Sequence, residues 1–336
     1  TQPYRTIKGR VLGPHGEPVN DRGLSVTAWV KRDHGRIYLK QGYLRHSRST
    51  VSSPDGTFEL KGLDGRPLVI QVRDHGMPVK DNPLPPCFYP GTFIRSEARQ
   101  VILGDREVVT DVDIRMPSSG GRVLFGRVVD DKGQGISKAL VSIFHTDMWF
   151  DLFYTYTDPN GGYRLQGLDE GAYIVHVDAM YQGYVKTRKE ATMAPAQDET
   201  ALDFALASGV AIRGRFEDQS GKPWSMGRSS GYIRTHPSGY ASNFPYGNRY
   251  APESIRKATT LWSEVGHGDH GVCYMAFPTP DTFLIPAALP GTGRLEFRPR
   301  EAKVVKILHG QQDITRKDIH VAPGQDINEV VIVVKP

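Results

Sequence analysis

A short pattern built around two glycines recurs three times along the chain, always with the same internal spacing. Each copy begins with Gly-Arg and an apolar residue, and a second glycine follows seven residues after the first. The copies are Gly9-Arg10-Val11 with Gly16, Gly126-Arg127-Val128 with Gly133, and Gly214-Arg215-Phe216 with Gly221. A pattern that repeats at fixed spacing marks copies of one structural unit, so we expect three similar folding units.

The residues around these glycines predict a strand that runs into a tight turn. Asp or His lies shortly before the second glycine, and Pro or Gly lies shortly after it. These residues favour turn conformations. In the second copy, residues 139–144 supply a return strand rich in β-branched and aromatic side chains. We therefore expect each copy to open with a β-hairpin.

A second element recurs downstream, where Asp-Gly or Asn-Gly precedes a strand that alternates aromatic and aliphatic residues. It covers 54–63 and 160–168, and a weaker version covers 280–291. Further strands follow at 68–72, 173–177 and 294–297, and the copies close on strands at 112–116, 202–206 and 330–334. Short strands with turn signals at near-regular spacing predict an all-β protein made of antiparallel β-sandwiches.

We expect three tandem β-sandwich modules at 1–117, 118–208 and 209–336, with helix confined to short turns. From the first glycine to the aromatic residue of the second element, the copies span 49, 37 and 69 residues. Modules one and three therefore carry insertions, a basic one at 31–50 and an aromatic, glycine-rich one at 224–275. Loops longer than about 12 to 15 residues are usually functional or disordered.

These motifs resemble the carboxypeptidase regulatory-like domains, which have a prealbumin-like, Ig-like sandwich and are strung together in bacterial envelope proteins. Besides the Gly-Arg-Val pattern, the resemblance rests on Asp55-Gly56-Thr57-Phe58, Asn160-Gly161-Gly162-Tyr163, Phe88-Tyr89-Pro90-Gly91, Lys306-Ile307-Leu308, Gly310, Asp313-Ile314 and Pro323-Gly324. The resemblance implies an exported module used for scaffolding, adhesion or ligand binding. It implies no particular activity, because one fold hosts many functions.

The ends of the chain favour an exported protein. It begins Thr1-Gln2-Pro3 without Met, which fits a mature chain after removal of a signal peptide. The apolar run at 330–334 is far shorter than the roughly 20 residues that a membrane-spanning helix needs. We expect a periplasmic or outer-surface location and no membrane span.

The two cysteines do not define a disulfide framework. Cys87 and Cys273 fall in different predicted modules, so two unpaired thiols are the default expectation. Cys273 also belongs to a weak metal-site candidate with His267 and His270. Because a closed structural zinc site needs four ligands, a glycine-rich turn is the favoured interpretation of this cluster.

The candidate partner-binding residues lie in the two insertions. They are Arg32, Arg36, Arg45 and Arg48 in the basic insertion, and Tyr232, Tyr240, Phe244, Tyr246, Tyr250 and Trp262 in the aromatic one. Tyr and Trp bury large areas at low entropic cost, which suits binding surfaces. The alternatives are a solvated face for the basic insertion and a loop folded over its own sandwich for the aromatic one.

The sequence offers little support for catalysis. Residues 227–231 match a nucleophile-elbow pattern but lack the α/β context that this chemistry requires. The prealbumin-like sandwich also resembles that of intradiol ring-cleaving dioxygenases, whose iron is held by two Tyr and two His. The second module supplies His145, Tyr154, Tyr156, His176, Tyr181 and Tyr184, but not the closely spaced His pair on one strand. We expect no enzyme and no cofactor.

The favoured function is a non-catalytic exported scaffold that binds protein partners, such as an accessory periplasmic subunit that bridges parts of a membrane complex. The alternative is a glycan-binding array of modules at the cell surface. The net charge of +5 permits weak attraction to anionic surfaces. Nucleic acid is not an expected partner, because no recognition helix or aromatic stacking platform accompanies the basic residues.

Overall fold

The computed structural model describes residues 5–19, 23–30, 48–63, 65–74, 84–104, 108–145, 148–195, 197–225, 233–234, 272–273, 281–288, 290–293, 295 and 302–335. Within them the chain is all-β, as predicted, and its two helices are three-residue 3-10 turns, η2 (Arg95–Glu97) and η3 (Met180–Gln182). Among these residues, no helix has the length and hydropathy that a membrane crossing requires.

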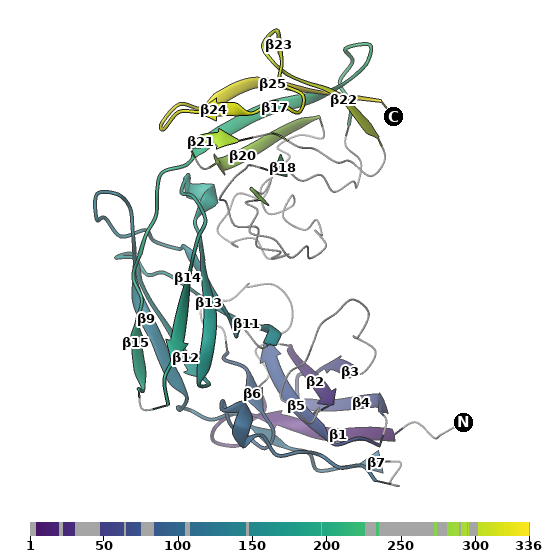
Figure 1. Cartoon of the computed structure of the whole chain (residues 1–336). Helices are drawn as coiled ribbons and strands as arrows, with labels where there is room; N and C mark the ends of the chain where they lie inside the picture. The colour runs from purple at the N-terminus through teal and green to yellow at the C-terminus, as the bar shows by residue number, and fades with distance from the viewer. Residues whose placement is uncertain are drawn as a thin grey trace.

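Buried side chains gather in three separate clusters, and we name the segments that contribute them the first, second and third units. The first cluster spans Ile7 to Met116, the second Leu124 to Leu206, and the third Val210 to Val334. The units follow one another along a curved path, with the second unit in the middle (Figure 1). The module boundaries after residues 117 and 208 stay predictions.

The first and second units each contain two four-stranded sheets. In one sheet of the first unit, β1 (Arg5–Leu12) lies between β4 (Thr57–Leu63) and the short strands β7 (Val108–Val109) and β8 (Ile114–Arg115). The other sheet has the strand order β3 (Arg48–Val51), β2 (Leu24–Val30), β5 (Leu68–Asp74), β6 (Cys87–Phe88). In the second unit, β9 (Arg122–Val129) lies between β12 (Gly162–Leu168) and the short strands β15 (Glu199–Ala201) and β16 (Phe204–Ala205), and the other sheet has the order β11 (Met148–Tyr156), β10 (Leu140–His145), β13 (Gly171–Asp178), β14 (Thr187–Met193).

The third unit has one larger sheet, with the order β20 (Thr282–Ala288), β17 (Val210–Asp218), β25 (Ile327–Lys335), β22 (Lys303–His309), β23 (Gln312–Asp313). Two strand pairs accompany it, β18 (Ile233–Arg234) with β19 (Val272–Cys273) and β21 (Gly291–Gly293) with β24 (Ile319–Val321). Of the predicted strand at 294–297, only the buried Leu295 lies within the described residues.

The same strand neighbours recur around the first strand of every unit. β1, β9 and β17 pair antiparallel with β4, β12 and β20, and they place the repeated glycine opposite the aromatic residue of the second element: Gly9 opposite Phe58, Gly126 opposite Tyr163, Gly214 opposite Phe283. On its other edge each first strand pairs parallel with the closing strand. The predicted antiparallel sandwiches are therefore wrong in this detail, because the first sheet of each unit is mixed.

The predicted hairpins are also wrong. The turn after β1 closes on a single bridge between Leu12 and Pro18, and the next strand, β2, then pairs with β3 and β5 in the other sheet. The turn at 53–57 likewise leads from β3 in one sheet to β4 in the other. Both turn types have the residues of a hairpin turn, but here they carry the chain between the two layers.

The repeated glycines are required because the closing strand approaches them directly. A Cβ atom on Gly9 would lie 2.1 Å from the carbonyl oxygen of Val112, and one on Gly126 would lie 2.2 Å from that of Leu202. The closing strand is interrupted at this point, and the next residue, Asp113 or Asp203, accepts the backbone N–H of Arg10 or Arg127 through its carboxylate. The predicted closing strands at 112–116 and 202–206 are thus shortened to β8 and β16.

In the turn after the first strand, a side-chain carboxylate accepts backbone N–H groups. An aspartate supplies this carboxylate in the second and third units, and a glutamate supplies it in the first. Asp130 Oδ1 accepts the N–H groups of Lys132 and Gln134 at 2.9 and 2.8 Å, and Asp218 does the same in the third unit. The first unit has Gly13 at this position, and Glu17 Oε2 accepts the N–H of His15 at 2.9 Å. A Cβ on Gly13 would lie 2.0 Å from Glu17 Oε1, so the glutamate fills the place of the missing aspartate.

This substitution predicts a coupling between residues 13 and 17. We expect Gly13→Asp alone to destabilise the protein by about 1 kcal/mol, because the new side chain meets the Glu17 carboxylate. Glu17→Ala should cost a similar amount, since it removes an acceptor, and the double variant should return close to wild-type stability. Urea unfolding of the four proteins in a double-mutant cycle measures the coupling. Strictly additive losses would show that the two carboxylates do not occupy the same place.

Candidate functional site

Of the predicted partner-binding residues, the structure describes Arg48. It begins β3, its side chain is exposed, and its Nε donates a hydrogen bond to the Gly62 carbonyl oxygen at 3.2 Å. The remaining candidates lie outside the described residues: Arg32, Arg36, Arg45, Tyr232, Tyr240, Phe244, Tyr246, Tyr250 and Trp262. Their role as a binding surface stays a prediction.

Described residues near the ends of both predicted insertions belong to strands or pack against a core. Residues 48–50 belong to β3, and Ala28 of β2 pairs with Arg48, so the ends of the basic insertion lie side by side. Trp224 is part of the third core, with its ring edge-on to Phe216 at 6.0 Å between centroids. Arg234 and Val272 are paired in β18 and β19, so the ends of the stretch 235–271 are neighbours too.

The weak metal candidate also lies mostly beyond the described residues. His267 and His270 are outside them, and Cys273 pairs with Ile233 at the backbone level in β19. In the described ranges, no three His, Cys, Asp or Glu side chains are close enough together to hold a metal ion. Cys87 is a free, buried cysteine, and its burial raises the pKa of the thiol to about 12.

The residues considered for a dioxygenase-like iron site lie on β10, β11 and β13, in η3 and just after η3. Tyr154 and His176 flank Ser142 on adjacent strands. Tyr181 belongs to η3, where its Oη donates to the Lys138 carbonyl at 3.0 Å, and Tyr184 bridges to Ser208 near the end of the unit. Backbone register places His145 opposite Met148 and Tyr173.

Buried polar side chains instead gather on the outer faces of the sheets β3-β2-β5-β6 and β11-β10-β13-β14. In the second unit Ser142 and His176 are 5% and 7% exposed, although they alternate with core residues and point to the opposite side of the sheet. In the first unit Gln71 is 1% exposed, and Trp29 Nε1 donates to its Oε1 at 3.1 Å. Both sheets lie on the concave side of the curved path (Figure 1).

His176 is the most strongly perturbed of these groups. Burial, followed by the nearby positive charges of Lys186 and Arg188, lowers its pKa to about 3. The imidazole is therefore neutral at physiological pH, and its protonation is opposed by the fold. His176 therefore does not exchange protons readily near neutral pH. Its protonation in acid would instead destabilise the fold.

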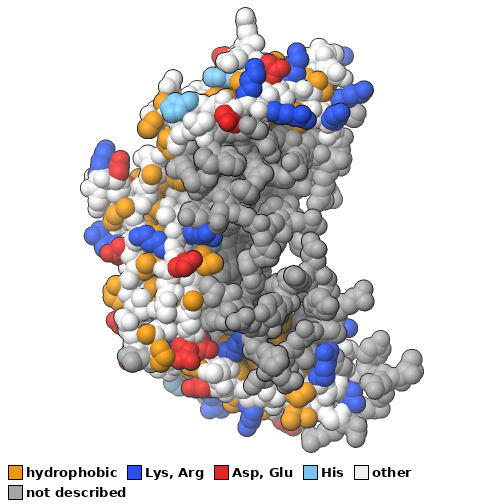
Figure 2. All heavy atoms as spheres, viewed as in Figure 1, with side chains coloured by type: hydrophobic (Ala, Val, Ile, Leu, Met, Phe, Trp, Pro, Cys, Tyr) orange, Lys and Arg blue, Asp and Glu red, His pale blue; other side chains and the backbone are white. Residues whose placement is uncertain are grey.

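The outer faces of the sheets that contain the first strands are solvent-exposed and carry ion pairs. Lys8 pairs with Glu59 at 3.2 Å, Arg164 with Glu199 at 2.7 Å, and Arg213 with Asp326 at 2.6 Å. Acidic and basic side chains are interspersed over the described surface in view, without a large area of one sign (Figure 2). Exposed pairs of this kind contribute little to stability, about 0 to 1 kcal/mol each.

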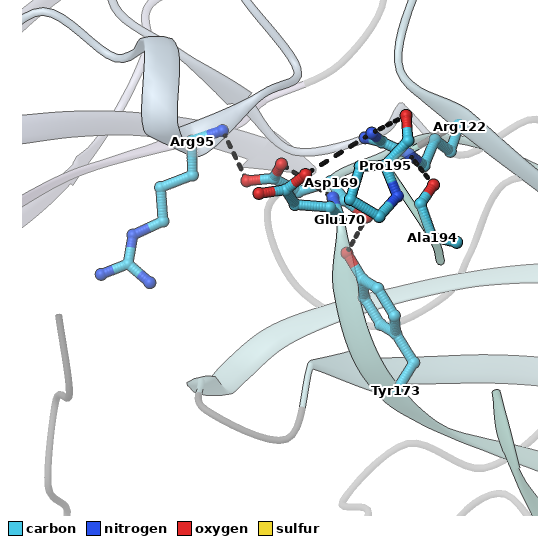
Figure 3. Close-up of polar contacts among 7 residues, drawn as sticks. All are labelled: Arg95, Arg122, Asp169, Glu170, Tyr173, Ala194 and Pro195. Atoms are coloured by element: carbon cyan, nitrogen blue, oxygen red, sulfur yellow. Dashed lines mark hydrogen bonds and ion pairs between the residues drawn. The ribbon is translucent and has the colours of Figure 1, made fainter. Parts of the chain in front are cut away.

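The junction between the first and second units is a compact group of polar contacts (Figure 3). The backbone N–H of Arg95 in η2 donates to Asp169 Oδ2 at 3.0 Å, while its guanidinium points away from the contact. Tyr173 Oη donates to the Asp169 carbonyl at 3.1 Å. Arg122 Nε and Nη2 donate to the carbonyls of Ala194 and Pro195 at 2.8 and 2.9 Å, and Nη2 lies 3.6 Å from Glu170.

Gly121 and Gly167 also bring the linker, the second unit and two side chains of the first unit into close contact at this junction. A Cβ on Gly121 would lie 2.6 Å from the Gly167 Cα. A Cβ on Gly167 would lie 2.7 Å from Pro85 Cβ and 3.2 Å from Phe93 Cγ. The linker and both units are therefore in direct contact here.

The second junction, between the second and third units, is a short stretch of paired backbone. Gly209 N–H donates to the Gly183 carbonyl at 2.7 Å, and Val185 N–H donates to the Ala207 carbonyl at 2.9 Å. A Cβ on Gly209 would lie 2.6 Å from the Cβ of Ala287 in β20. The three residues between the second and third cores are thus bonded to one unit and packed against the other.

The sequence predicted that modules meet after residues 117 and 208, but it did not predict the residues that hold the junctions. Arg95 and Asp169 are 74 positions apart, and no local pattern connects them. The one available signal was the Gly-Leu pair that ends the second element, Gly62-Leu63 and Gly167-Leu168. It does not identify a junction, because the space next to Gly62 is taken by the Arg48 side chain of the same unit.

Comparison with known proteins identifies one segment. Residues 123–207 match the carboxypeptidase regulatory-like domain family, which confirms the expected resemblance for the second unit. Among curated proteins, no sequence matches this chain.

Solved structures give only weak similarities. The Bacillus anthracis TIE protein aligns over 99% of this chain and 51% of its own, at 12% identity and a TM-score of 0.25, so this chain spans about half its length. A streptococcal ancillary pilin aligns over 99% of both chains at 11% identity and a TM-score of 0.29. A 3-chlorocatechol 1,2-dioxygenase from Rhodococcus opacus 1CP aligns over 27% of this chain and 61% of its own, at 14% identity and a TM-score of 0.23. TM-scores this low do not establish a shared overall fold.

Proposed function

We propose, taking residues 123–207 as a carboxypeptidase regulatory-like domain, that this chain is an exported, non-catalytic protein that holds protein partners at a fixed spacing. The observation that carries the proposal is the pair of junctions. Each linker is hydrogen-bonded to or packed against both of its neighbours, as the contacts of Gly120 with Phe93, of Gly121 with Gly167 and of Gly209 illustrate. Direct contact between consecutive units suits a spacer better than a set of independent domains.

Two buried titratable groups, one in the first core and one on the outer face of a sheet in the second unit, support a non-catalytic role. General acid–base catalysis works best with a pKa near the operating pH. The pKa of His176 lies near 3 and that of the Cys87 thiol near 12, so burial moves both away from neutrality. These shifts fit buried groups with a structural role.

The two insertions are the proposed partner surfaces, with the basic residues of 31–48 and the aromatic residues of 232–262 as contacts. In interfaces, a few Arg, Tyr and Trp side chains usually carry most of the binding energy. Two surfaces on one chain of connected units would hold their partners at a set distance and raise the effective concentration of the second. A membrane complex with periplasmic parts is the proposed kind of partner.

The proposal is tested by shortening both insertions where their ends are neighbours. A short turn can replace residues 31–46 next to the Ala28–Arg48 pair, and another can replace 236–270 next to the Arg234–Val272 pair. We expect thermal unfolding to stay nearly unchanged, while co-purification of partners from native membranes, read by mass spectrometry, is lost. A matched control, Arg164→Ser with Glu199→Ser, removes an exposed ion pair and should leave association intact.

Two outcomes would contradict the proposal. Association of the shortened protein at wild-type affinity would place the partner surface elsewhere. Retention of the wild-type protein on polysaccharide, lost on Tyr→Ala changes at 232, 240, 246 and 250, would favour the glycan-binding alternative instead.

A further inference from the structure

We infer that the first junction is a locked elbow, which fixes one angle between the first and second units so that they move as a single body. This inference rests on the proposed function, because a spacer must keep its partner surfaces at a constant separation. It goes further in assigning the rigidity to two groups of contacts at one junction. Domains joined by a linker otherwise move relative to one another by default.

The first group of contacts is the close packing around Gly167. Gly167 has a φ of +78°, which favours glycine, and it is enclosed by Gly121 of the linker and by Pro85 and Phe93 of the first unit. The hypothetical Cβ distances of 2.6 to 3.2 Å show that these segments already touch. Close packing of this kind leaves little freedom to rotate about the linker.

The second group of contacts is polar and engages a different part of the first unit. The Asp169 carboxylate accepts the Arg95 N–H from the first unit and the Glu170 N–H from its own turn. Tyr173 and Arg122 hold that turn from inside the second unit, through Asp169 and Glu170 (Figure 3). Apolar contacts at Gly167 and a hydrogen bond at Asp169 together restrain both separation and twisting of the two units.

The protein with both groups of junction contacts unaltered provides the first test. Spin labels on cysteines introduced at Lys61 of β4 and Ala201 of β15, both exposed, report the separation of the two units. The native cysteines are replaced by Ala in this background. A locked elbow predicts one narrow distance distribution in double electron–electron resonance. A broad or multiple distribution would overturn the inference.

A pair of glycine variants provides the matched comparison. Gly167 and Gly133 have the same φ of +78°, but a Cβ on Gly133 has no neighbour within 4 Å. Both Ala substitutions therefore impose the same backbone strain, and only Gly167→Ala forces the junction apart. We expect Gly167→Ala to shift the distance by several Å and broaden it, and Gly133→Ala to leave the distribution unchanged. Equal behaviour of the two variants would overturn the inference.

A second variant keeps the test decisive if Gly167→Ala does not fold. Asp169→Ala removes the acceptor for Arg95 without changing a core side chain, and it should broaden the distribution without shifting the thermal transition of the units. An unchanged distribution would show that this contact does not restrain the elbow. All of these measurements use the chain without a partner, so their failure is distinct from a failure of partner association.

Discussion

Gly9→Ala is expected to lower the free energy of unfolding by about 3 kcal/mol, at the upper end of the range for inserting atoms into a packed site. The new Cβ would lie 2.1 Å from the Val112 carbonyl oxygen and 3.0 Å from Phe58 Cζ. Gly9 lies in β1, which is paired on both edges, so the strand cannot move away from the contact without breaking ladder hydrogen bonds. Urea unfolding of the full chain, followed by circular dichroism, measures the loss.

Gly23→Ala is the matched control for this prediction. Its Cβ would meet one atom, Cγ1 of the exposed Val51 at 3.1 Å, and Gly23 is itself exposed. Its effect should stay within about 0.5 kcal/mol, as for most surface substitutions. Gly214→Ala should resemble Gly9→Ala, because the Val330 carbonyl and the Phe283 ring crowd it in the same way. Equal losses for Gly9→Ala and Gly23→Ala would mean that the repeated glycine is not required by close packing.

The sequence predicted the elements of the fold better than their connections. The fixed glycine spacing and the aromatic residues of the second element identified strands that the structure pairs with each other, as in Gly126 opposite Tyr163. Alternation of apolar residues tells which face of a strand is buried, but not which strand lies beside it. For that reason the sequence did not predict that the closing strands pair parallel with the first strands. Turn-forming residues such as His15-Gly16 likewise do not tell whether the chain folds back within one sheet or crosses to the other sheet.

The candidate sites were less predictable because they depend on contacts between distant parts of the chain. The insertions are predicted from length alone, and Arg48 and Arg234, described residues within the predicted insertions, lie in paired strands. The junction contacts of Gly167 and Asp169 depend on how one unit rests on another, which a repeat pattern does not encode. Likewise, the alternation of residues in β13 predicts that His176 faces solvent, yet its exposed fraction in the structure is 7%.

His176→Gln is expected to remove a large part of the acid sensitivity of the protein. In the unfolded chain this imidazole binds a proton as the pH falls below about 6.5, whereas in the folded protein it stays neutral down to a pKa of about 3. The unfolded state therefore binds more protons in this interval, and stability falls as the pH falls. The slope is about 1.4 kcal/mol per pH unit, which amounts to about 3 kcal/mol at a pH of about 4.5.

The measurement is the free energy of unfolding in urea at several pH values between about 6.5 and 4.5. Carboxylates that are stabilised in the fold, such as Asp326 beside Arg213, have lowered pKa values and lose their contribution at still lower pH, so they do not produce this slope. Wild type should show the full slope, and His176→Gln should show a much flatter one. His320→Gln, at an exposed position, is the control and should keep the wild-type slope. If the slope persists in His176→Gln, the acid sensitivity arises from another group and the buried imidazole is not its source.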